Sequence, residues 1–457
     1  MGQYEDSLGK DHPAIARVVT ENQLAAQRGH EQPGVVFQRQ GMTLAQSIVA
    51  EGTLPRAPRI AFLGDSIVKD CFTLTSTWTL GGWVAWARRF LADRVQIDGV
   101  DIYGVGGSTV EHVLTTQIPL LPASVYTHAV VCTGQNQITS LPELAPIYQG
   151  IIDALSDKGL RVILIPTRIR GASSPLSADN FACLAAVTQW MHGAARSNPA
   201  VSVFNPNPLY TDYSSGYSNA AYLRDETHDN FAGAQMFGKA FAQWFGAQLP
   251  DQSPLQSHLN DAFDVIKNPR GNLLLNGILS GTSGTKANGA TGNVATSWAG
   301  NRSSAGATHS ATFSKGTDAT NATLPVQIIT FGGTGDTLSS TLQQEVSIDA
   351  IGIVAGDRIY AECDVEWNAA VAGSAGIALY LRITDVSTVV IADRWDGYKN
   401  TAWGYLSGTA GRATFRTEPV ALPVGFSKTR AQLFLYPQPS GAAAGEFRVS
   451  RFAIRLA

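Results

Sequence analysis

Charged residues are scarce in this chain: only 15% of its 457 residues are Asp, Glu, Lys or Arg, and the formal net charge is −3. No dense stripe of Lys and Arg occurs, so we expect no nucleic acid as a partner. No apolar run approaches the length that spans a bilayer, so we expect no membrane insertion. The first residues lack the basic and apolar segments of a signal peptide, and we expect no signal-driven export.

Cysteine is also rare. The four cysteines stand far apart, at positions 71, 132, 183 and 363, and their mostly apolar surroundings favour free buried thiols over disulfides. Zinc-ligand spacings such as HExxH and CxxC are absent, so we expect no metal. The GxGxxG and GxxxxGK[ST] phosphate loops and the GxSxG elbow are absent too. We therefore expect no cofactor, and the α/β-hydrolase pattern does not fit.

The length of the chain predicts two or three domains. Residues 1–57 are polar with short apolar patches, which predicts an arm of short helices. In residues 58–248 apolar strands alternate with helical patterns, which indicates an α/β fold: a doubly wound parallel sheet with helices on both faces. We expect strands near 59–64, 97–103, 127–133, 161–166 and 201–205, and helices near 78–93, 108–120, 141–157, 178–197 and 229–247.

The composition changes after a predicted linker at 249–270, which contains Pro250 and Pro254. Residues 271–457 are first crowded with Gly, Ser, Thr, Ala and Asn and then carry short alternating strands with almost no helix. This pattern predicts an all-β, jelly-roll-like sandwich. Its clearest strands are expected at 357–367, 376–383, 411–420, 428–436 and 445–456.

Two short motifs suggest nucleophilic catalysis. Ser66 follows Gly-Asp at the end of the strand predicted at 59–64, and Asp225 precedes His228 by three residues just ahead of the last helix. Serine needs a neutral imidazole as base, and a carboxylate orients that imidazole. Each residue alone is compatible with a helix cap or a loop position, but no other histidine has so suggestive a neighbourhood. The sequence therefore predicts a catalytic triad of Ser66, Asp225 and His228.

Two further segments fit beside the nucleophile, because the carboxyl ends of parallel strands share one sheet edge. The glycine-rich turn at 102–109 contains Gly107, and the apolar strand at 127–133 leads to Asn136. Both residues are common turn formers. They also have the groups that stabilise an oxyanion, a backbone N–H and a side-chain amide.

These four blocks, in this order, resemble the SGNH (GDSL-type) hydrolase family over residues 58–248. The resemblance implies a flavodoxin-like sheet, Ser66 as nucleophile, Asp225 and His228 as its dyad, and an oxyanion hole formed by Ser66, Gly107 and Asn136. The chain departs from the family pattern at Ile67, at Ile102 and at Gln137, where the family usually has aspartate. The last change leaves the hydrogen bonding of that loop open.

Aromatic residues suggest where a substrate binds. The loop at 207–224 contains Tyr213, Tyr217 and Tyr222, which predict either a platform for sugars or a loop packed by its own rings. In the β domain a cluster of aromatic residues suggests a sugar site, a core edge or a subunit interface. That cluster consists of Trp395, Tyr398, Trp403 and Tyr405.

The start and the closing strand of the β domain resemble carbohydrate-binding modules of bacteriophage tail proteins. With the hydrolase motifs, this predicts a serine esterase that removes O-acetyl or other small acyl groups from a polysaccharide, such as a bacterial capsule. We expect a homotrimeric tailspike or receptor-binding protein, located in a virion or otherwise extracellular. The alternatives are a general lipid or small-ester hydrolase, and a glycan-binding protein with a vestigial triad.

Overall fold

The computed structural model describes residues 57–69, 82–249, 261–269, 271–349, 351–368, 371, 376–399, 410–437 and 441–457. The predicted N-terminal arm, except Ala57, lies outside the described residues, and so does Cys71. The other three cysteines, Cys132, Cys183 and Cys363, are free and buried, which confirms the expectation for them. Within the described residues no helix is long and apolar enough to cross a membrane.

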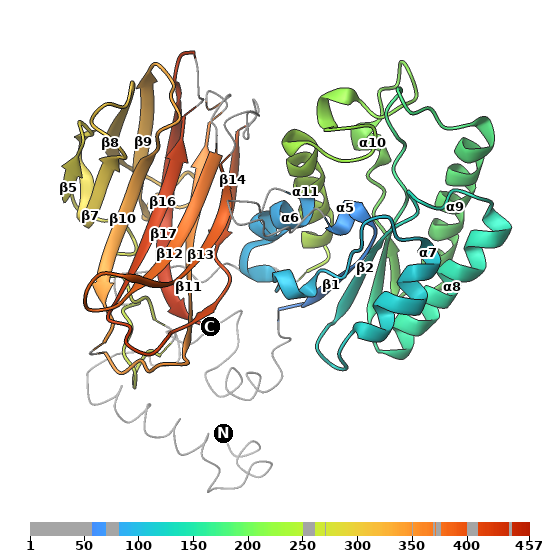
Figure 1. The fold of residues 1–457 in the computed structure, drawn as a ribbon, viewed down its shortest axis with the longest axis horizontal. Coiled ribbons are helices and arrows are strands. Elements are labelled where there is room, and N and C mark those ends of the chain that lie inside the picture. The colour runs from blue at the N-terminus through green and yellow to red at the C-terminus, as the bar shows by residue number, and fades with distance from the viewer. Residues whose placement is uncertain are drawn as a thin grey trace, which may run out of the picture. The chain divides into compact units, whose positions relative to one another are not determined.

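A parallel sheet forms the centre of the α/β part (Figure 1). Its four described strands lie in the order β1-β2-β3-β4. They are apolar on both faces, as a sheet covered on both sides requires. The strands span Ile60–Gly64 (β1), His128–Cys132 (β2), Arg161–Ile165 (β3) and Val201–Val203 (β4).

Helices cover both faces of this sheet (Figure 1), as predicted. Ile60 and Phe62 belong to one apolar cluster, with α6 (Trp83–Leu91) and α11 (Phe231–Gly246). Ala61 and Leu63 belong to the other, with α8 (Leu141–Asp157) and α9 (Ala178–Ser197). The shorter elements are α5 (Ser66–Lys69), η1 (Ala92–Arg94), η2 (Gly99–Asp101), α7 (Val110–His112), η3 (Val113–Gln117), η4 (Ile118–Leu120), α10 (Asn207–Tyr210) and η5 (Ala220–Tyr222).

The prediction of a strand at 97–103 is wrong. Gln96 and Ile102 make only single bridges to β1, with Arg59 and Phe62. Between them the side chains of Asp98 and Asp101 cap the short helix η2, each accepting a backbone N–H. Acidic residues that bond local amides favour such turns over strands, so the pattern of apolar residues at 97, 100 and 102 was misleading.

A β-sandwich follows, as predicted. Among the described residues one sheet has the order β13-β12-β16-β10-β7-β5, and the other has the order β14-β11-β17-β9-β8-β6, with β15 paired to β11. Most pairs are antiparallel, which suits sheets with one solvated face. The strands span Ser283–Ala287 (β5), Thr291–Gly292 (β6), Val294–Arg302 (β7), His309–Thr317 (β8), Pro325–Gly333 (β9), Ser340–Ser347 (β10), Arg358–Trp367 (β11), Gly376–Thr384 (β12), Val390–Lys399 (β13), Gly411–Arg416 (β14), Val420–Ala421 (β15), Lys428–Tyr436 (β16) and Gly445–Leu456 (β17).

The predicted linker at 249–270 is described only in part. Residues 250–260 and Arg270 lie outside the described residues. Residues 261–269 contact the sandwich, because Asp261 pairs with Arg455 of β17 at 2.6 Å and the backbone N–H of Phe263 donates to Asn272. The domain boundaries stay a prediction.

Helix α6 of the α/β part packs directly on strands of the sandwich. Trp86 makes edge contacts with the rings of Trp367 and Phe415. Beside them Arg89 bonds Asp396 of β13 at 2.8 Å, and both side chains are fully buried. Arg88 pairs with the same carboxylate at 3.0 Å. A buried ion pair enclosed by aromatic rings therefore joins the two parts.

We predict that Asp396→Ala lowers the free energy of unfolding by about 3–5 kcal/mol, because it leaves two buried guanidinium groups without their carboxylate. Denaturant unfolding measures the change. The matched control is Asp393→Ala on the same strand, where the half-buried carboxylate bonds the hydroxyl of Tyr380. The control is expected to lose only about 1 kcal/mol, and equal losses in the two variants would contradict the account of this interface.

Candidate active site

The turn after β1 presents Ser66. A side chain at Gly64 would collide with the carbonyl of Cys132 on β2, so this tight passage requires glycine. Asp65 is fully buried, and its carboxylate accepts the backbone N–H of Ile67 at 3.0 Å and of Gln135 at 3.3 Å. Burial raises the pKa of Asp65 to about 6, although both hydrogen bonds oppose the shift. Asp65 therefore holds the turn from the protein interior. Ser66 begins α5 and stays partly exposed.

The loop before α11 brings the predicted base to this serine. Nε2 of His228 lies 2.8 Å from Oγ of Ser66, and Nδ1 lies 2.9 Å from Oδ2 of Asp225. Burial alone would raise the pKa of Asp225, but the N–H groups of His228 and Thr227 and the imidazole lower it to about 2. An ionised carboxylate only accepts hydrogen bonds. Nδ1 therefore donates to Asp225, and the neutral imidazole accepts the Ser66 proton at Nε2.

The glycine-rich turn is fastened to the same strand end. The carbonyl of Gly64 accepts the N–H of Val105 at 3.0 Å and the hydroxyl of Ser108 at 2.9 Å. Gln117 also bonds both the N–H and the carbonyl of Gly64, each at 2.8 Å. Gly107 in this turn is exposed, has φ of 76° and has open space where a side chain would stand. Gln117 was missed because a lone glutamine in a helical segment has no sequence signature.

Asn136 follows β2 and faces this turn. Its Nδ2 donates to the carbonyl of Ser108 at 3.1 Å, and an amide nitrogen has two N–H groups. One is used to hold the side chain, and the exposed amide has a second for an oxyanion. The neighbouring Gln137 accepts the N–H of Val110, the first residue of α7, at 2.9 Å. The glutamine amide thus anchors this loop at the position where the family usually has aspartate.

The predicted substrate tyrosines differ in their surroundings. Tyr213 is 79% exposed at the tip of its loop. Tyr217 packs edge-on against Phe181, and Tyr222 packs edge-on against Tyr210, so these two rings are half buried. In the β domain Trp395 stacks on Tyr380, with ring centroids 3.6 Å apart. The side chain of Tyr398 and residues Trp403 and Tyr405 lie outside the described residues.

The sandwich contains a second set of hydrogen-bonded Asp, His and Ser side chains, which was not predicted from the sequence. Nδ1 of His309 lies 2.9 Å from Asp336, and Nε2 lies 3.0 Å from Oγ of Ser340. His309 and Ser340 are both fully buried, so no ester can reach this hydroxyl. The three residues stand on different strands and loops, and no sequence spacing signals them. They offer matched controls for the exposed triad.

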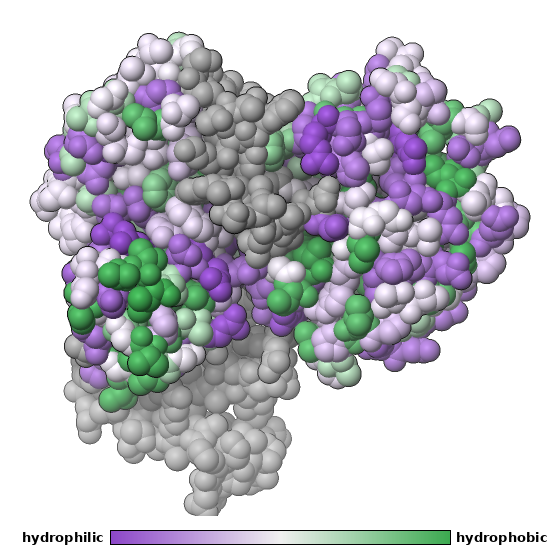
Figure 2. All heavy atoms as spheres, viewed as in Figure 1, coloured by the Kyte–Doolittle hydropathy of each residue, from purple (hydrophilic) through white to green (hydrophobic). Residues whose placement is uncertain are grey.

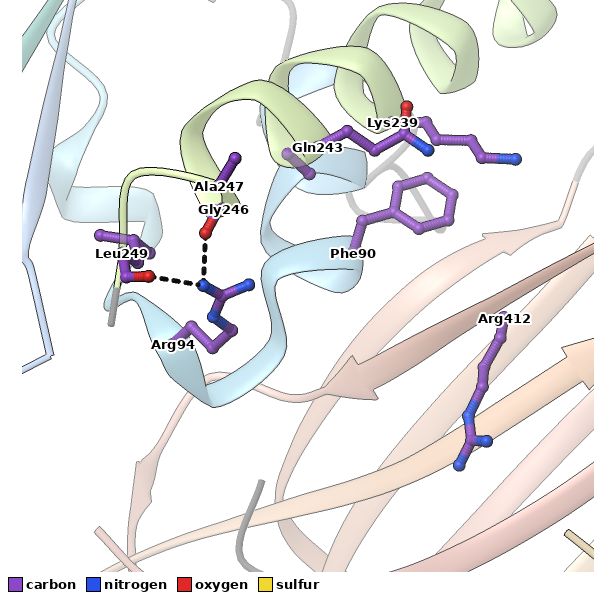
Figure 3. Close-up of a pocket in the computed structure, with 9 residues that line it drawn as sticks. Phe90, Arg94, Lys239, Gln243, Gly246, Ala247, Leu249 and Arg412 are labelled. Atoms are coloured by element: carbon purple, nitrogen blue, oxygen red, sulfur yellow. Dashed lines mark hydrogen bonds between the residues drawn. The ribbon is translucent and has the colours of Figure 1, made fainter. Parts of the chain in front are cut away.

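A hollow of about 630 Å³ lies elsewhere, lined by residues of α6, η1, α11, the segment just after α11, and β14 (Figure 3). Arg94 bonds the carbonyl oxygens of Gly246 and Leu249 at its edge. Its lining residues are distinct from the triad. The triad itself is open to solvent, because the side chains of Asp225 and His228 are 49% and 25% exposed.

This geometry defines the class of site. A serine at the carboxyl end of a strand, an imidazole within hydrogen-bonding distance and a carboxylate on the other ring nitrogen are the triad of a serine hydrolase. Each of the residues predicted for the triad and the oxyanion hole lies at this one edge of the sheet.

The comparisons agree with this class. Residues 62–236 match the model of the GDSL-like Lipase/Acylhydrolase family. None of the curated proteins that were compared matches the chain. Over these residues the chain is similar to the GDSL-like acylhydrolases, and the triad geometry at Ser66 is compatible with the hydrolysis of ester bonds.

Several solved structures are similar to parts of the chain. One is a member of the lipolytic protein G-D-S-L family from Veillonella parvula, at 17% identity over 41% of this chain and 98% of that chain, with a TM-score of 0.33. Another is a carbohydrate esterase family 3 from Talaromyces cellulolyticus, at 15% identity over 43% and 100%, with a TM-score of 0.32. A third is the enzymatically active domain of tailspike protein 4 of bacteriophage CBA120, at 13% identity over 35% of this chain and a TM-score of 0.25. The match spans 20% of that tailspike chain.

We predict that Asn136→Ala lowers kcat for a chromogenic acetyl ester by about 10²–10³-fold, because one oxyanion donor is lost from the transition state. KM should change little, because the ground-state carbonyl carries less charge. Steady-state kinetics of the variant give both constants. A loss of kcat below about twofold would exclude an oxyanion role for this amide.

We predict that kcat/KM falls about tenfold per pH unit on the acid side of its profile, because protonated His228 cannot accept the Ser66 proton. Asp225, with a pKa of about 2, stays ionised at neutral and mildly acidic pH. Asp65, with a pKa of about 6, titrates at mildly acidic pH. The variant Asp65→Asn separates the two groups, and an acid limb that disappears in this variant would assign the limb to Asp65.

Proposed function

We propose that this protein is a carbohydrate O-acetylesterase, which removes acetyl or other small acyl groups from a polysaccharide. The observation that carries the proposal is the openness of an intact triad. The side chains of Asp225 and His228 are 49% and 25% exposed and Ser66 is itself partly exposed, so among the described residues the nucleophile is open to a bulky polymer. Most of the α/β surface visible in Figure 2 mixes polar residues with small separate groups of hydrophobic ones, a surface suited to a hydrated glycan rather than to a lipid.

Each step of the reaction is assigned to particular residues. His228 takes the Ser66 proton as Oγ attacks the ester carbonyl carbon. The backbone N–H groups of Ser66 and Gly107 and the Asn136 amide hold the oxyanion. The carbonyl re-forms, the sugar hydroxyl leaves with the proton from His228, and the acyl group stays on Oγ. Water, activated by His228, then attacks this acyl-enzyme and releases acetate and free Ser66.

The proposal extends to a homotrimeric tailspike or receptor-binding protein of a virion that deacetylates host capsule. The low charge of the chain and its Gly-, Ser- and Thr-rich β segment support this role. The exposed Tyr213 offers a ring on which a sugar can stack. Light scattering during size-exclusion chromatography of the full chain tests the trimer, and a monomer at micromolar concentration would contradict it.

Acetate release from a panel of purified O-acetylated capsular polysaccharides, followed by proton NMR, tests the substrate class. We expect release from at least one capsule by the natural chain and none by Ser66→Ala. Preference for p-nitrophenyl palmitate over p-nitrophenyl acetate, without release from any glycan, would favour a lipid esterase. Tight glycan binding without hydrolysis of any ester would favour a binding protein with a vestigial triad.

A further inference from the structure

The loop that carries the base is held by one buried cation. Arg168 follows β3 and is only 5% exposed. Its guanidinium donates to the carbonyl of Thr227 and to the carboxylate of Asp229, which flank His228 on both sides. Two such contacts from one rigid planar group fix both the position and the orientation of the backbone segment that carries His228. We propose that Arg168 is a positioning residue of the triad, which places His228 within reach of Ser66; this rests on the proposed function of those two residues.

The surroundings of Arg168 hold it in one conformation. Its guanidinium lies over the ring of Tyr210, 4.2 Å from the centroid. The hydroxyl of Tyr210 lies 2.9 Å from the same Asp229 carboxylate and 3.1 Å from the carbonyl of Gly233 in α11. A cation stacked on a ring and paired with a carboxylate in the interior has little freedom to move. The position of the base loop is therefore fixed relative to β3 and α11.

The segment around Arg168 also contacts the other side of the site. The carbonyl of Arg168 accepts Nε2 of Gln135 at 2.7 Å, and Gln135 in turn bonds Asp65, which supports Ser66. Further along the segment, the N–H of Gly171 donates to the carbonyl of Glu226 at 2.9 Å. One continuous set of bonds thus runs from the turn of the nucleophile through residues 168–171 to the loop of the base.

The two hydrogen bonds of the His228 imidazole, to Asp225 and to Ser66, depend on different parts of the structure. Its bond to Asp225 is local, because both residues lie in one four-residue turn and Asp225 also accepts the N–H groups of Thr227 and His228 at 2.8 Å. The bond from Nε2 to Ser66 is not local, and it depends on where the turn is placed. Loss of Arg168 should therefore leave the imidazole paired with Asp225 but move it away from Ser66.

The variant Arg168→Lys tests this inference, because an ammonium keeps the charge near Asp229 but lacks the planar fork that also reaches Thr227. We expect kcat on p-nitrophenyl acetate to fall about 10- to 100-fold, since misplacement of about 1 Å has that cost. KM is expected to stay within about threefold, and the acid limb of the pH profile is expected to keep its position, because the Asp225 pair is intact. Asp225→Asn, in contrast, should move the acid limb.

The matched control is Arg89→Lys, which alters the buried Arg89–Asp396 pair on α6. Both variants are expected to lose stability, but only Arg168→Lys should lose kcat in the folded fraction. Equal kcat in Arg168→Lys and the natural chain would overturn the inference, and so would a shifted acid limb. If Arg168→Lys does not fold, Tyr210→Phe replaces it and is expected to give a smaller fall of kcat. An unchanged kcat in Tyr210→Phe would then overturn the inference. An inactive natural chain would instead refute the proposed function.

Discussion

Ser66→Ala is expected to lower the rate of ester hydrolysis by on the order of 10³-fold or more, because the acyl-enzyme route requires the Oγ nucleophile. The loss should appear in kcat. The fold should stay intact, since Ser66 is a partly exposed residue and the substitution removes one oxygen atom. Hydrolysis of p-nitrophenyl acetate by purified protein measures the effect, and circular dichroism verifies the fold.

The sandwich supplies the control for this experiment. Ser340→Ala removes a hydroxyl with the same partners, an imidazole 3.0 Å away and a carboxylate behind it, but from a buried position. Its activity is expected to equal that of the natural chain. Activity retained in Ser66→Ala, or lost in Ser340→Ala while the protein stays folded, would contradict the assignment of the nucleophile.

His228→Ala is expected to have the second largest effect, also on the order of 10³-fold or more in kcat, because Ser66 then keeps its proton at neutral pH. The residual rate should lose the part of the acid limb that arises from protonation of the base, since the imidazole is gone. A pH series of kcat/KM for the variant measures both changes.

His309→Ala is the matched control for the base. His309 has the same pair of partners in the sandwich and is fully buried, so its loss should lower stability and leave the turnover of folded protein unchanged. A His228→Ala variant that keeps the rate and the acid limb of the natural chain would show that another group serves as base.

The sequence predicted the α/β part well where apolar runs are long. β1, β2 and β3 lie within a residue or two of their predicted ranges, because each alternates between two apolar clusters on the two faces of the sheet. The strand expected at 97–103 failed, because Asp98 and Asp101 close a local turn that competes with pairing. In the sandwich β16 and β17 match their predicted ranges, since buried and half-buried residues alternate along most of β16 and β17 is buried continuously from Val449 to Arg455.

The site was predictable where its groups are close in sequence or in a known order. Asp225 and His228 belong to one turn, Ser66 and Asn136 each follow a strand of the sheet, and Gly107 follows Ile102, which makes a single bridge to β1. Arg168 and Gln117 were not predicted, because their roles arise from bonds to residues 53 to 61 positions away. The side chains of Asp336, His309 and Ser340 show that hydrogen bonds alone do not identify an active site. They have the same bonds as a triad, and only the burial of His309 and Ser340 distinguishes them.

The central claim is that Ser66 is the nucleophile and that His228 activates it. Labelling the full natural chain with a fluorophosphonate probe, followed by peptide mass spectrometry, tests it most directly, because the probe reacts with a serine only where a base has activated it. The account predicts a single adduct, on Ser66, with none on the buried Ser340 and none on any serine in His228→Ala. An adduct on another serine, or no adduct in a preparation that hydrolyses acetyl esters, would contradict it.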